Sequence, residues 1–170
     1  YPNVKKLMYP TICNHCENAV CVDVCPTGAT YRREDGIIAV DQDVCIGCQY
    51  CVMACPYDQR NYIDTEDRAY YDQGKSEREQ LGEKMYPLKK NTVAKCTFCM
   101  ERIDEGLKKG LIPGKDREAT PACVNTCYTH ARIFGDLDDP ESDVSKLIRE
   151  YNGKTLFEEI GTGPAVYYIE

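Results

Sequence analysis

The chain has 170 residues, twelve of them cysteine, a net charge of −7 and a mean hydropathy of −0.53. The length allows one domain or two small packed domains, and a core drawn from three Phe and no Trp would be thin. The acidic charge argues against nucleic-acid binding, which needs a dense basic surface. No apolar stretch reaches the roughly 18 residues of a membrane-spanning helix, and no secretory signal peptide is visible.

The first cysteine run follows a lead-in over residues 1–12, which its prolines predict to be extended. The spacing of the run is C-x2-C-x4-C-x3-C-P, and its members are Cys13, Cys16, Cys21 and Cys25. Residues 30–41 come next, where Asp35-Gly36 between β-forming residues predicts a hairpin. The order is therefore a cysteine loop, a short helix and a hairpin.

A second run has the spacing C-x2-C-x2-C-x3-C-P, and its members are Cys45, Cys48, Cys51 and Cys55. Residues 52–54 are expected on a short helix. This spacing is typical of the bacterial-type run that binds 4Fe–4S clusters, in which the fourth cysteine binds the other cluster of a pair. The rule predicts one cluster held by Cys13, Cys16, Cys21 and Cys55. It predicts a second held by Cys45, Cys48, Cys51 and Cys25.

Two other uses of cysteine fit the pattern less well. Disulfides need an oxidising compartment and do not explain two runs that end in Cys-Pro. Zinc favours two C-x-x-C knuckles for each tetrahedral site, often with His, and rarely takes four thiolates from so tight a run.

Residues 64–90 are rich in charge, with no steady apolar period, and lie between strands expected near Tyr62-Ile63 and Val93-Ala94. A solvated loop is favoured there over a docking element. A third cysteine group follows and matches the other runs if residues 100–122 are an insertion that begins as a helix and ends in a Gly/Pro loop. Its members are Cys96, Cys99, Cys123 and Cys127. Tyr128 replaces the proline after the last cysteine, which weakens the prediction of a tight turn.

Two interpretations of the third group stay open. Its four cysteines close a cluster by themselves, or Cys127 belongs to a fourth cluster whose own run lies upstream of Tyr1. The start at Tyr1 rather than Met favours a trimmed N-terminus.

The C-terminal part is expected to hold a strand at 131–136 and a helix that begins at Asp139-Pro140-Glu141, with Asp139 as N-cap. An apolar face of this helix suits packing: Val144, Leu147, Ile148 and Tyr151. The helix should end at Asn152-Gly153, and residues 164–169 are expected to form a closing strand.

These elements predict an α+β fold that looks like a repeated two-cluster bacterial ferredoxin, with loop insertions and a C-terminal helix. The expected organisation is a two-cluster core over 1–63, an inserted loop over 64–90, the third cysteine group over 91–136 and a helix with a closing strand over 137–170.

Residues 13–57, 95–99 and 116–127 resemble the electron-transfer iron–sulfur (beta) subunit of the dimethyl sulfoxide reductase family of molybdenum oxidoreductases. The resemblance covers nearly the whole chain and is specific for the subunit type. Residues 110–127 and 135–140 more closely resemble members of the polysulfide, thiosulfate, tetrathionate and arsenate reductase type. The resemblance implies four cysteine runs, the first pairing with the last, so the chain holds three clusters if complete and four if an N-terminal run is missing.

The resemblance also implies the function and the partners. We expect electron relay, without catalysis on this chain, between a large molybdenum (or tungsten) bis-pterin catalytic subunit and a membrane quinone-reactive subunit or a cytochrome. The compartment implied is the periplasmic face of the cytoplasmic membrane, with the cytoplasmic side as the alternative. A subunit of a formate dehydrogenase or hydrogenase and a free polyferredoxin are the alternative functions.

No dinucleotide fingerprint, P-loop or nucleophile–base pair suggests catalysis. His15, inside the first cysteine loop, has two interpretations, hydrogen bonding to a cluster sulfur and loop packing, and His130 has the same two. Lys95, Arg132 and the Arg32-Arg33 pair could offset cluster charge, although a solvated surface is the simpler expectation.

Overall fold

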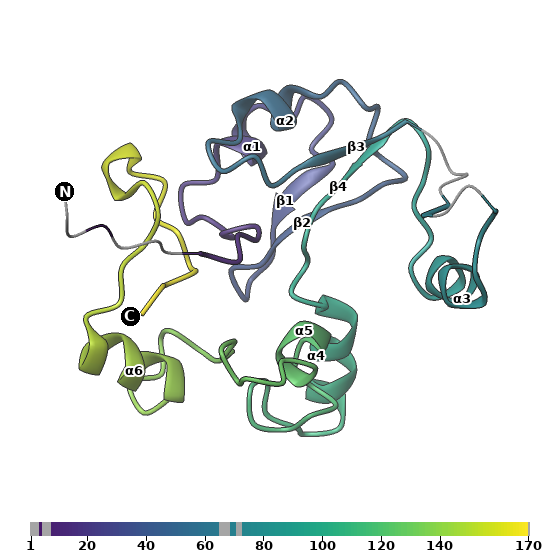
Figure 1. Cartoon of the computed structure of the whole chain (residues 1–170). Coiled ribbons are helices and arrows are strands. Elements are labelled where there is room, and N and C mark those ends of the chain that lie inside the picture. Colours follow the sequence, from purple (N-terminus) through teal and green to yellow (C-terminus); the bar gives the residue numbers. More distant parts are fainter. Residues whose placement is uncertain (1–3, 5–7, 65–68, 71–72, 170) are drawn as a thin grey trace. The chain divides into compact units, whose positions relative to one another are not determined.

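The computed structural model describes residues 4, 8–64, 69–70 and 73–169. Contacts divide the chain into two compact units (Figure 1). The central unit comprises residues 19–95, and the terminal unit comprises residues 1–18 and 96–170. Each unit has its own small group of buried side chains.

The central unit contains two antiparallel ribbons, which supply its largest fully buried side chains. Strand β1 (Thr30–Arg32) pairs with β2 (Ile38–Val40), and β3 (Asn61–Ile63) pairs with β4 (Thr92–Ala94). The predicted hairpin at Asp35-Gly36 is confirmed, and so are the strands expected on either side of residues 64–90. The largest fully buried side chains of the unit are those of Ile38, Ile63, Val93 and Thr92.

Two short helices carry cysteines in the central unit. Helix α1 (Val20–Asp23) packs against α2 (Tyr50–Ala54) and against β1. Both helices were expected, and α2 includes the predicted residues 52–54. The β1–β2 ribbon therefore supports α1, which carries Cys21, and α1 in turn packs against α2, which carries Cys51.

The expectation of a loop alone over 64–90 is wrong for residues 77–85, which form helix α3 (Glu77–Met85). Its N-terminus is a capping box: Ser76 Oγ accepts from Glu79 N, and the Glu79 carboxylate accepts from Ser76 N. These hydrogen bonds, with one from the Tyr70 amide, lower the pKa of Glu79. No α3 residue is buried, so the cap rather than an apolar face defines the helix. Residues 65–68 and 71–72 of the predicted loop lie outside the described residues.

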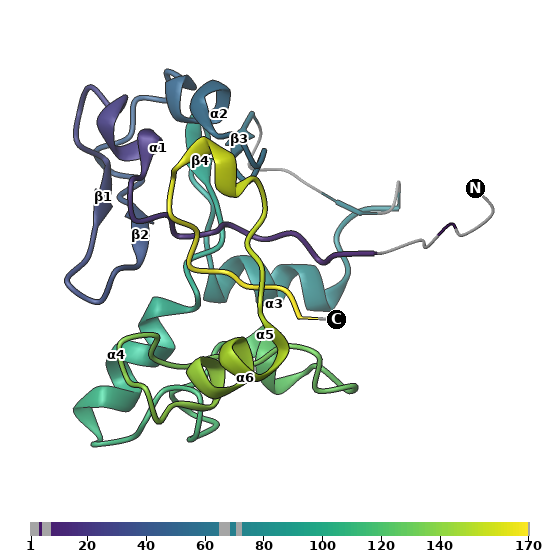
Figure 2. The ribbon, with the colours of Figure 1, turned by 90° about the vertical axis from the view of Figure 1, so that its left-hand side faces the viewer.

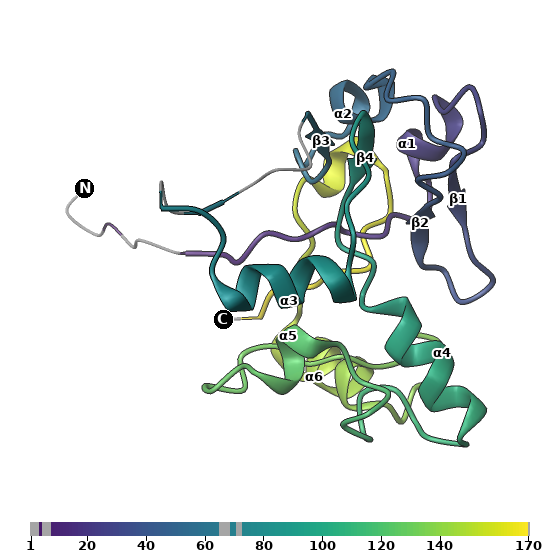
Figure 3. The same ribbon diagram turned by 90° about the vertical axis from the view of Figure 1, so that its right-hand side faces the viewer.

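The terminal unit begins its helical part with α4 (Met100–Lys108), as predicted, and continues through a Gly/Pro loop to α5 (Ala122–Asn125) (Figure 3). The backbones meet closely at Gly106, where an added Cβ would lie 2.3 Å from Ala119 Cβ. Arg102 joins the two segments because its Nε donates to the carbonyl oxygen of Thr120 at 2.9 Å. The insertion therefore folds back so that residues 117–120, which precede α5, lie against α4.

Residues 161–165 run along the first cysteine loop (Figure 2). The amides of Glu17 and Asn18 donate to the carbonyls of Gly163 and Thr162 at 2.7 and 2.9 Å. The amide of Ala165 donates to the carbonyl of Asn14 at 2.8 Å. We call residues 161–165 the tail strap. A 3-10 turn, η1 (Glu158–Ile160), precedes it.

The two predicted C-terminal strands are wrong. Residues 131–136 form no strand, and the segment 164–169 contributes only one antiparallel bridge, between Lys154 and Tyr168. A strand needs a neighbour along its length to pair its amides and carbonyls. Residues 164–169 divide their backbone hydrogen bonds between Asn14 and Lys154, so no single neighbour runs along them. Within the described part of the chain, no strand pairs with residues 131–136.

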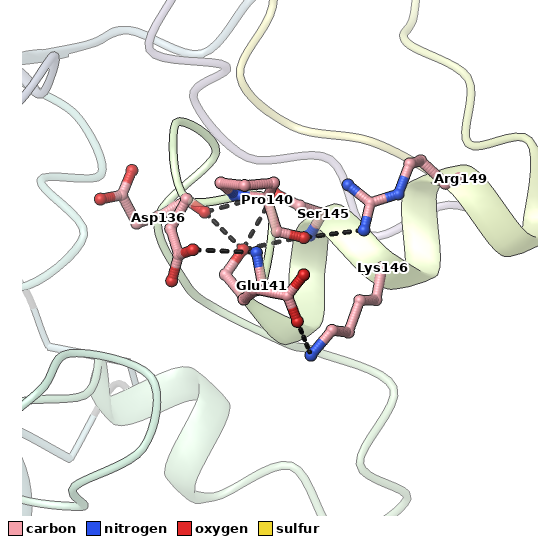
Figure 4. Close-up of polar contacts among 8 residues, drawn as sticks. Asp136, Pro140, Glu141, Ser145, Lys146 and Arg149 are labelled. Atoms are coloured by element: carbon pink, nitrogen blue, oxygen red, sulfur yellow. Dashed lines mark hydrogen bonds and ion pairs between the residues drawn. The ribbon is translucent and has the colours of Figure 1, made fainter.

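Helix α6 (Asp143–Tyr151) exists and ends at the predicted Asn152, but its start at Asp139 is wrong. The Asp139 carboxylate accepts from the Glu141 amide at 2.8 Å, in a turn that does not continue into the helix. The N-cap is Ser142, whose Oγ accepts from Ser145 N at 3.3 Å. Figure 4 shows two basic side chains of α6 that hold this turn: Arg149 donates to the Pro140 carbonyl, and Lys146 pairs with Glu141.

Replacing Ser142 with alanine is expected to lower the opening free energy of α6 by about 1–2 kcal/mol, because the cap is lost and the Asp136 carbonyl loses a donor. Asp139→Ala removes a hydrogen bond at an exposed turn and should lower the opening free energy of α6 by no more than about 0.5 kcal/mol. Amide hydrogen exchange of α6 measures both values. A larger effect at Asp139 would contradict the assignment of Ser142 as the cap.

Candidate iron–sulfur centres

The three C-x-x-C loops share one backbone feature, a left-handed residue before the second cysteine. It is His15 in the first loop, Gly47 in the second and Phe98 in the third, with φ of 44°, 68° and 52°. A positive φ reverses the chain within two residues, which lets two neighbouring cysteines serve one site. Two of these positions adopt the conformation without glycine.

The third cysteine of each run lies in the first turn of a short helix. These cysteines are Cys21 in α1, Cys51 in α2 and Cys123 in α5. Each lies two residues after the N-cap of its helix. The 23-residue insertion before Cys123 therefore leaves its local setting unchanged.

The fourth cysteine of each run opens a turn that ends in another left-handed residue. The amides of Gly28, Asp58 and His130 donate to the carbonyls of Cys25, Cys55 and Cys127 at 3.3, 3.3 and 3.1 Å. Tyr128 in place of proline therefore does not remove the turn, although the absence of proline had weakened that prediction. The His130 side chain is exposed.

Several cysteine sulfurs accept hydrogen bonds from backbone amides. Thr30 N lies 3.4 Å from Cys25 Sγ, Phe98 N lies 3.5 Å from Cys96 Sγ, and Ala122 N lies 3.4 Å from Cys99 Sγ. Such donors stabilise a sulfur that carries negative charge. Hydrogen bonds to the sulfurs are one of the ways in which a protein sets the reduction potential of a thiolate-bound cluster.

The pKa of two fourth-position cysteines is lowered. Burial raises the pKa of the Cys25 thiol, but hydrogen bonds from Thr30 and Thr27 together bring it below its usual value. At Cys127 the hydroxyl of Thr129 is the main cause of the lowered pKa. Burial raises the pKa of this thiol, but the amides of Arg132, Ala131 and Thr129 also lower it. Both sulfurs are therefore biased toward the thiolate, the form that binds iron.

A buried arginine contacts a third sulfur. The Arg60 side chain is 3 % exposed, its Nη2 lies 2.9 Å from Cys21 Sγ, and its Nη1 donates to Thr30 Oγ1 at 3.0 Å. No carboxylate of the described residues pairs with this guanidinium. A buried cation needs an anionic partner. A cluster bound through the Cys21 thiolate would provide one.

The other polar residues singled out from the sequence have simpler surroundings. His15 is buried and stacks on Phe98, with ring centroids 3.8 Å apart, and Phe98 also meets Phe134 edge-on. This contact corresponds to loop packing. Lys95 Nζ donates to the Ile38 carbonyl, and Arg33 pairs with Asp35 at 2.9 Å.

The residues fit iron–sulfur clusters. All twelve cysteines lie in the described part of the chain, none is in a disulfide, and eleven are at least partly exposed. The central unit contains Cys21, Cys25, Cys45, Cys48, Cys51 and Cys55; the terminal unit contains Cys13, Cys16, Cys96, Cys99, Cys123 and Cys127. Among the described residues no three metal-binding side chains converge on one ion. The thiolates of a 4Fe–4S cube bind different iron atoms and need not do so.

Comparison with known proteins agrees with this chemistry. Residues 4–89 match the model of the 4Fe–4S dicluster domain family. The chain is 47 % identical, over 94 % of its length, to a Halobacterium salinarum protein provisionally named as the iron–sulfur B subunit of dimethyl sulfoxide reductase. It is 38 % identical, over 99 %, to the iron–sulfur subunit of the arsenate respiratory reductase of a Shewanella species, and 39 % identical, over 98 %, to the B subunit of tetrathionate reductase from Salmonella typhimurium. The chain belongs to the iron–sulfur subunits of the dimethyl sulfoxide reductase family.

The family membership confirms the resemblance drawn from the cysteine runs. The chain spans 54 %, 77 % and 53 % of the length of these three relatives, so it corresponds to little more than half of two of them. Two of these relatives are named as iron–sulfur subunits of reductases. Among the described residues, no helix has the length and apolar character needed to cross a bilayer.

Two kinds of residue in this iron–sulfur subunit were missed from the sequence. The recurring Cys-x-Thr at Cys25 and Cys127 is a visible signal, because the threonine stands at the same position after each cysteine. Arg60 gave no such signal. A single arginine five residues beyond Cys55 looks like any surface arginine until its burial is seen.

Proposed function

We propose that this chain holds 4Fe–4S clusters through all twelve cysteines and relays electrons through them. One cluster takes Cys13, Cys16, Cys21 and Cys55, and a second takes Cys45, Cys48, Cys51 and Cys25. Cys96, Cys99, Cys123 and Cys127 hold a third, or share two clusters with an N-terminal run outside this chain. A bound cluster of this kind stores and releases one electron. The main support is the backbone pattern that recurs around the three runs.

The same recurrence supports a repeated bacterial-ferredoxin-like fold. We infer a two-cluster core over 1–63, a second half completed by 91–136, an inserted segment over 64–90, and a C-terminal part over 137–170. Each run combines a left-handed loop residue, a short helix with the third cysteine and a turn after the fourth. The chain's contribution is to fix the thiolates and to supply hydrogen bonds to their sulfurs.

The stack of His15 on Phe98 supports an order for the relay. These residues occupy the same position in the first and third C-x-x-C loops, and their rings are in contact. We propose that the cluster held by the first loop is the neighbour of the one held by the third. By the crossed fourth cysteines, the cluster of the second run is the neighbour on the other side.

We further propose that this relay serves a molybdenum or tungsten bis-pterin catalytic subunit at one end and a membrane quinone-reactive subunit or a cytochrome at the other. A sulfur or arsenic oxyanion is the proposed substrate class of the catalytic subunit. Relatives named for arsenate and tetrathionate reductases support this choice. The periplasmic face of the membrane is the proposed location. The large subunit that co-purifies with the chain tests substrate and compartment together.

Iron and acid-labile sulfide analysis of the anaerobically purified full-length protein tests the cofactor. We expect about four irons and four sulfides for each of three or four clusters, since each cube has that composition. A mass equal to these 170 residues plus three clusters would favour the smaller number. One cluster only, or zinc in place of iron, would contradict the proposal.

A further inference from the structure

We propose that Arg60 raises the reduction potential of the cluster bound by Cys21, and so makes the two clusters of the central pair unequal electron acceptors. This proposal rests on the proposed function, since it concerns a cluster that the cysteines would hold. It starts from one contact, the guanidinium Nη2 at 2.9 Å from Cys21 Sγ. Arg60 is here a positioning residue that acts through a ligand.

The position of Arg60 is fixed from two sides. Its Nη1 donates to the hydroxyl of Thr30, which is itself 3 % exposed at the start of β1. The arginine side chain is equally buried, and β3 begins directly after it. The guanidinium therefore cannot turn to solvent without leaving both partners.

The charge of Arg60 has a direction of effect. An electron that arrives at a thiolate-bound cluster adds negative charge next to the guanidinium, while Arg60 stays protonated and no bond forms or breaks. A nearby buried cation stabilises the more negative state, because attraction between charges is strong where water is excluded. A charge-assisted hydrogen bond to a cluster sulfur acts in the same direction.

The effect should be selective. Thr30 also donates its amide to Cys25 Sγ, at 3.4 Å, and Cys25 is assigned to the other cluster. Cys25 Sγ therefore accepts a hydrogen bond from the neutral Thr30 amide, whereas Cys21 Sγ accepts one from the charged Arg60 guanidinium. Arg60 should then favour reduction of the cluster of Cys21 more than reduction of its neighbour.

The test is a potentiometric titration of the cluster-loaded full-length protein, followed by electron paramagnetic resonance. The signal that Cys21→Ser removes identifies the cluster concerned. Arg60→Gln is expected to lower the ratio of reduced to oxidised cluster about tenfold at a fixed potential, a shift of about 59 mV for one electron. The signal of the neighbouring cluster should move less. Arg60→Lys, which keeps the charge but not the planar fork, should recover part of the shift.

The matched control is Arg33→Gln. Arg33 belongs to the same unit, but its guanidinium pairs with Asp35 in the β1–β2 turn. Its removal should leave both potentials unchanged. If Arg60→Gln loses its clusters, Arg60→Met, which fills the same space with an apolar chain, is expected to retain them and to show the same selective fall.

The outcomes separate cleanly. Clusters present with unchanged potentials, an equal shift of both clusters, or loss of clusters in both the Gln and Met variants would overturn the role given to Arg60. The last result would make Arg60 a structural residue. Absence of clusters from the unmodified protein would instead overturn the proposed function.

Discussion

Cys55→Ser combined with Cys13→Ser is expected to remove no more iron than either substitution alone. The crossed assignment places both cysteines on one cluster, and a cluster lost once cannot be lost again. Each single variant and the double variant should therefore lack about four irons per chain relative to the unmodified protein. Iron and sulfide analysis of anaerobically purified protein measures the loss.

A second pair provides the control. In the proposed assignment, Cys55→Ser combined with Cys48→Ser removes a ligand from each of two clusters, and should remove about eight irons. Cys25→Ser with Cys48→Ser should again remove only about four. The opposite result would be a loss of about four irons in the Cys55 and Cys48 double variant and about eight in the Cys55 and Cys13 double variant. Each run would then bind its own cluster, and the crossed assignment would be wrong.

Gly47→Ala should strongly destabilise the ribbon of β3 and β4. Gly47 has a φ of +68°, and a Cβ added there would lie 2.2 Å from the backbone oxygen of Asn91. Asn91 is the residue before β4, and its amide donates to the Ile63 carbonyl at 2.7 Å. Left-handed strain of about 1–2 kcal/mol adds to an overpacking cost of about 1–3 kcal/mol. The total expected loss of opening free energy is about 2–5 kcal/mol.

Gly28→Ala separates the two contributions. Gly28 has a φ of +69°, nearly that of Gly47, but a Cβ added there would have no atom within 4 Å. This variant should therefore show the strain alone, about 1–2 kcal/mol. Amide hydrogen exchange gives the opening free energies, across β3 and β4 for Gly47→Ala and across β1 and β2 for Gly28→Ala. Equal losses in the two variants would show that contact with Asn91 contributes nothing.

The cysteine runs could be predicted because their information is local. Spacing and the residues within each run led to the short helices, the hairpin at Asp35-Gly36 and the family, which the relatives confirm. The capping box at Ser76 is equally local and was present in the sequence as Ser-x-x-Glu. Helix α3 could have been found from it.

The errors and omissions involve distant partners. The apolar patterns at 131–136 and 164–169 suit strands, yet a strand forms only where another lies beside it. The start of α6 depends on the Asp136 carbonyl, which accepts from the Ser142 hydroxyl. The contact of Arg60 with Cys21 joins residues 39 positions apart. The ligand assignment of the cysteines stays a prediction.

The tail strap has a consequence for the timing of biosynthesis. Asn18 donates its side-chain amide to the Gly161 carbonyl, 143 residues along the chain, and its backbone amide to Thr162. At about 5–20 residues per second, a ribosome needs roughly 7–30 s to travel from one to the other. The loop of Cys13 and Cys16 therefore leaves the ribosome long before its strap exists. Iron delivered during translation would meet an incomplete first loop, so we expect the cluster proposed for this loop to be inserted after synthesis has passed residue 165.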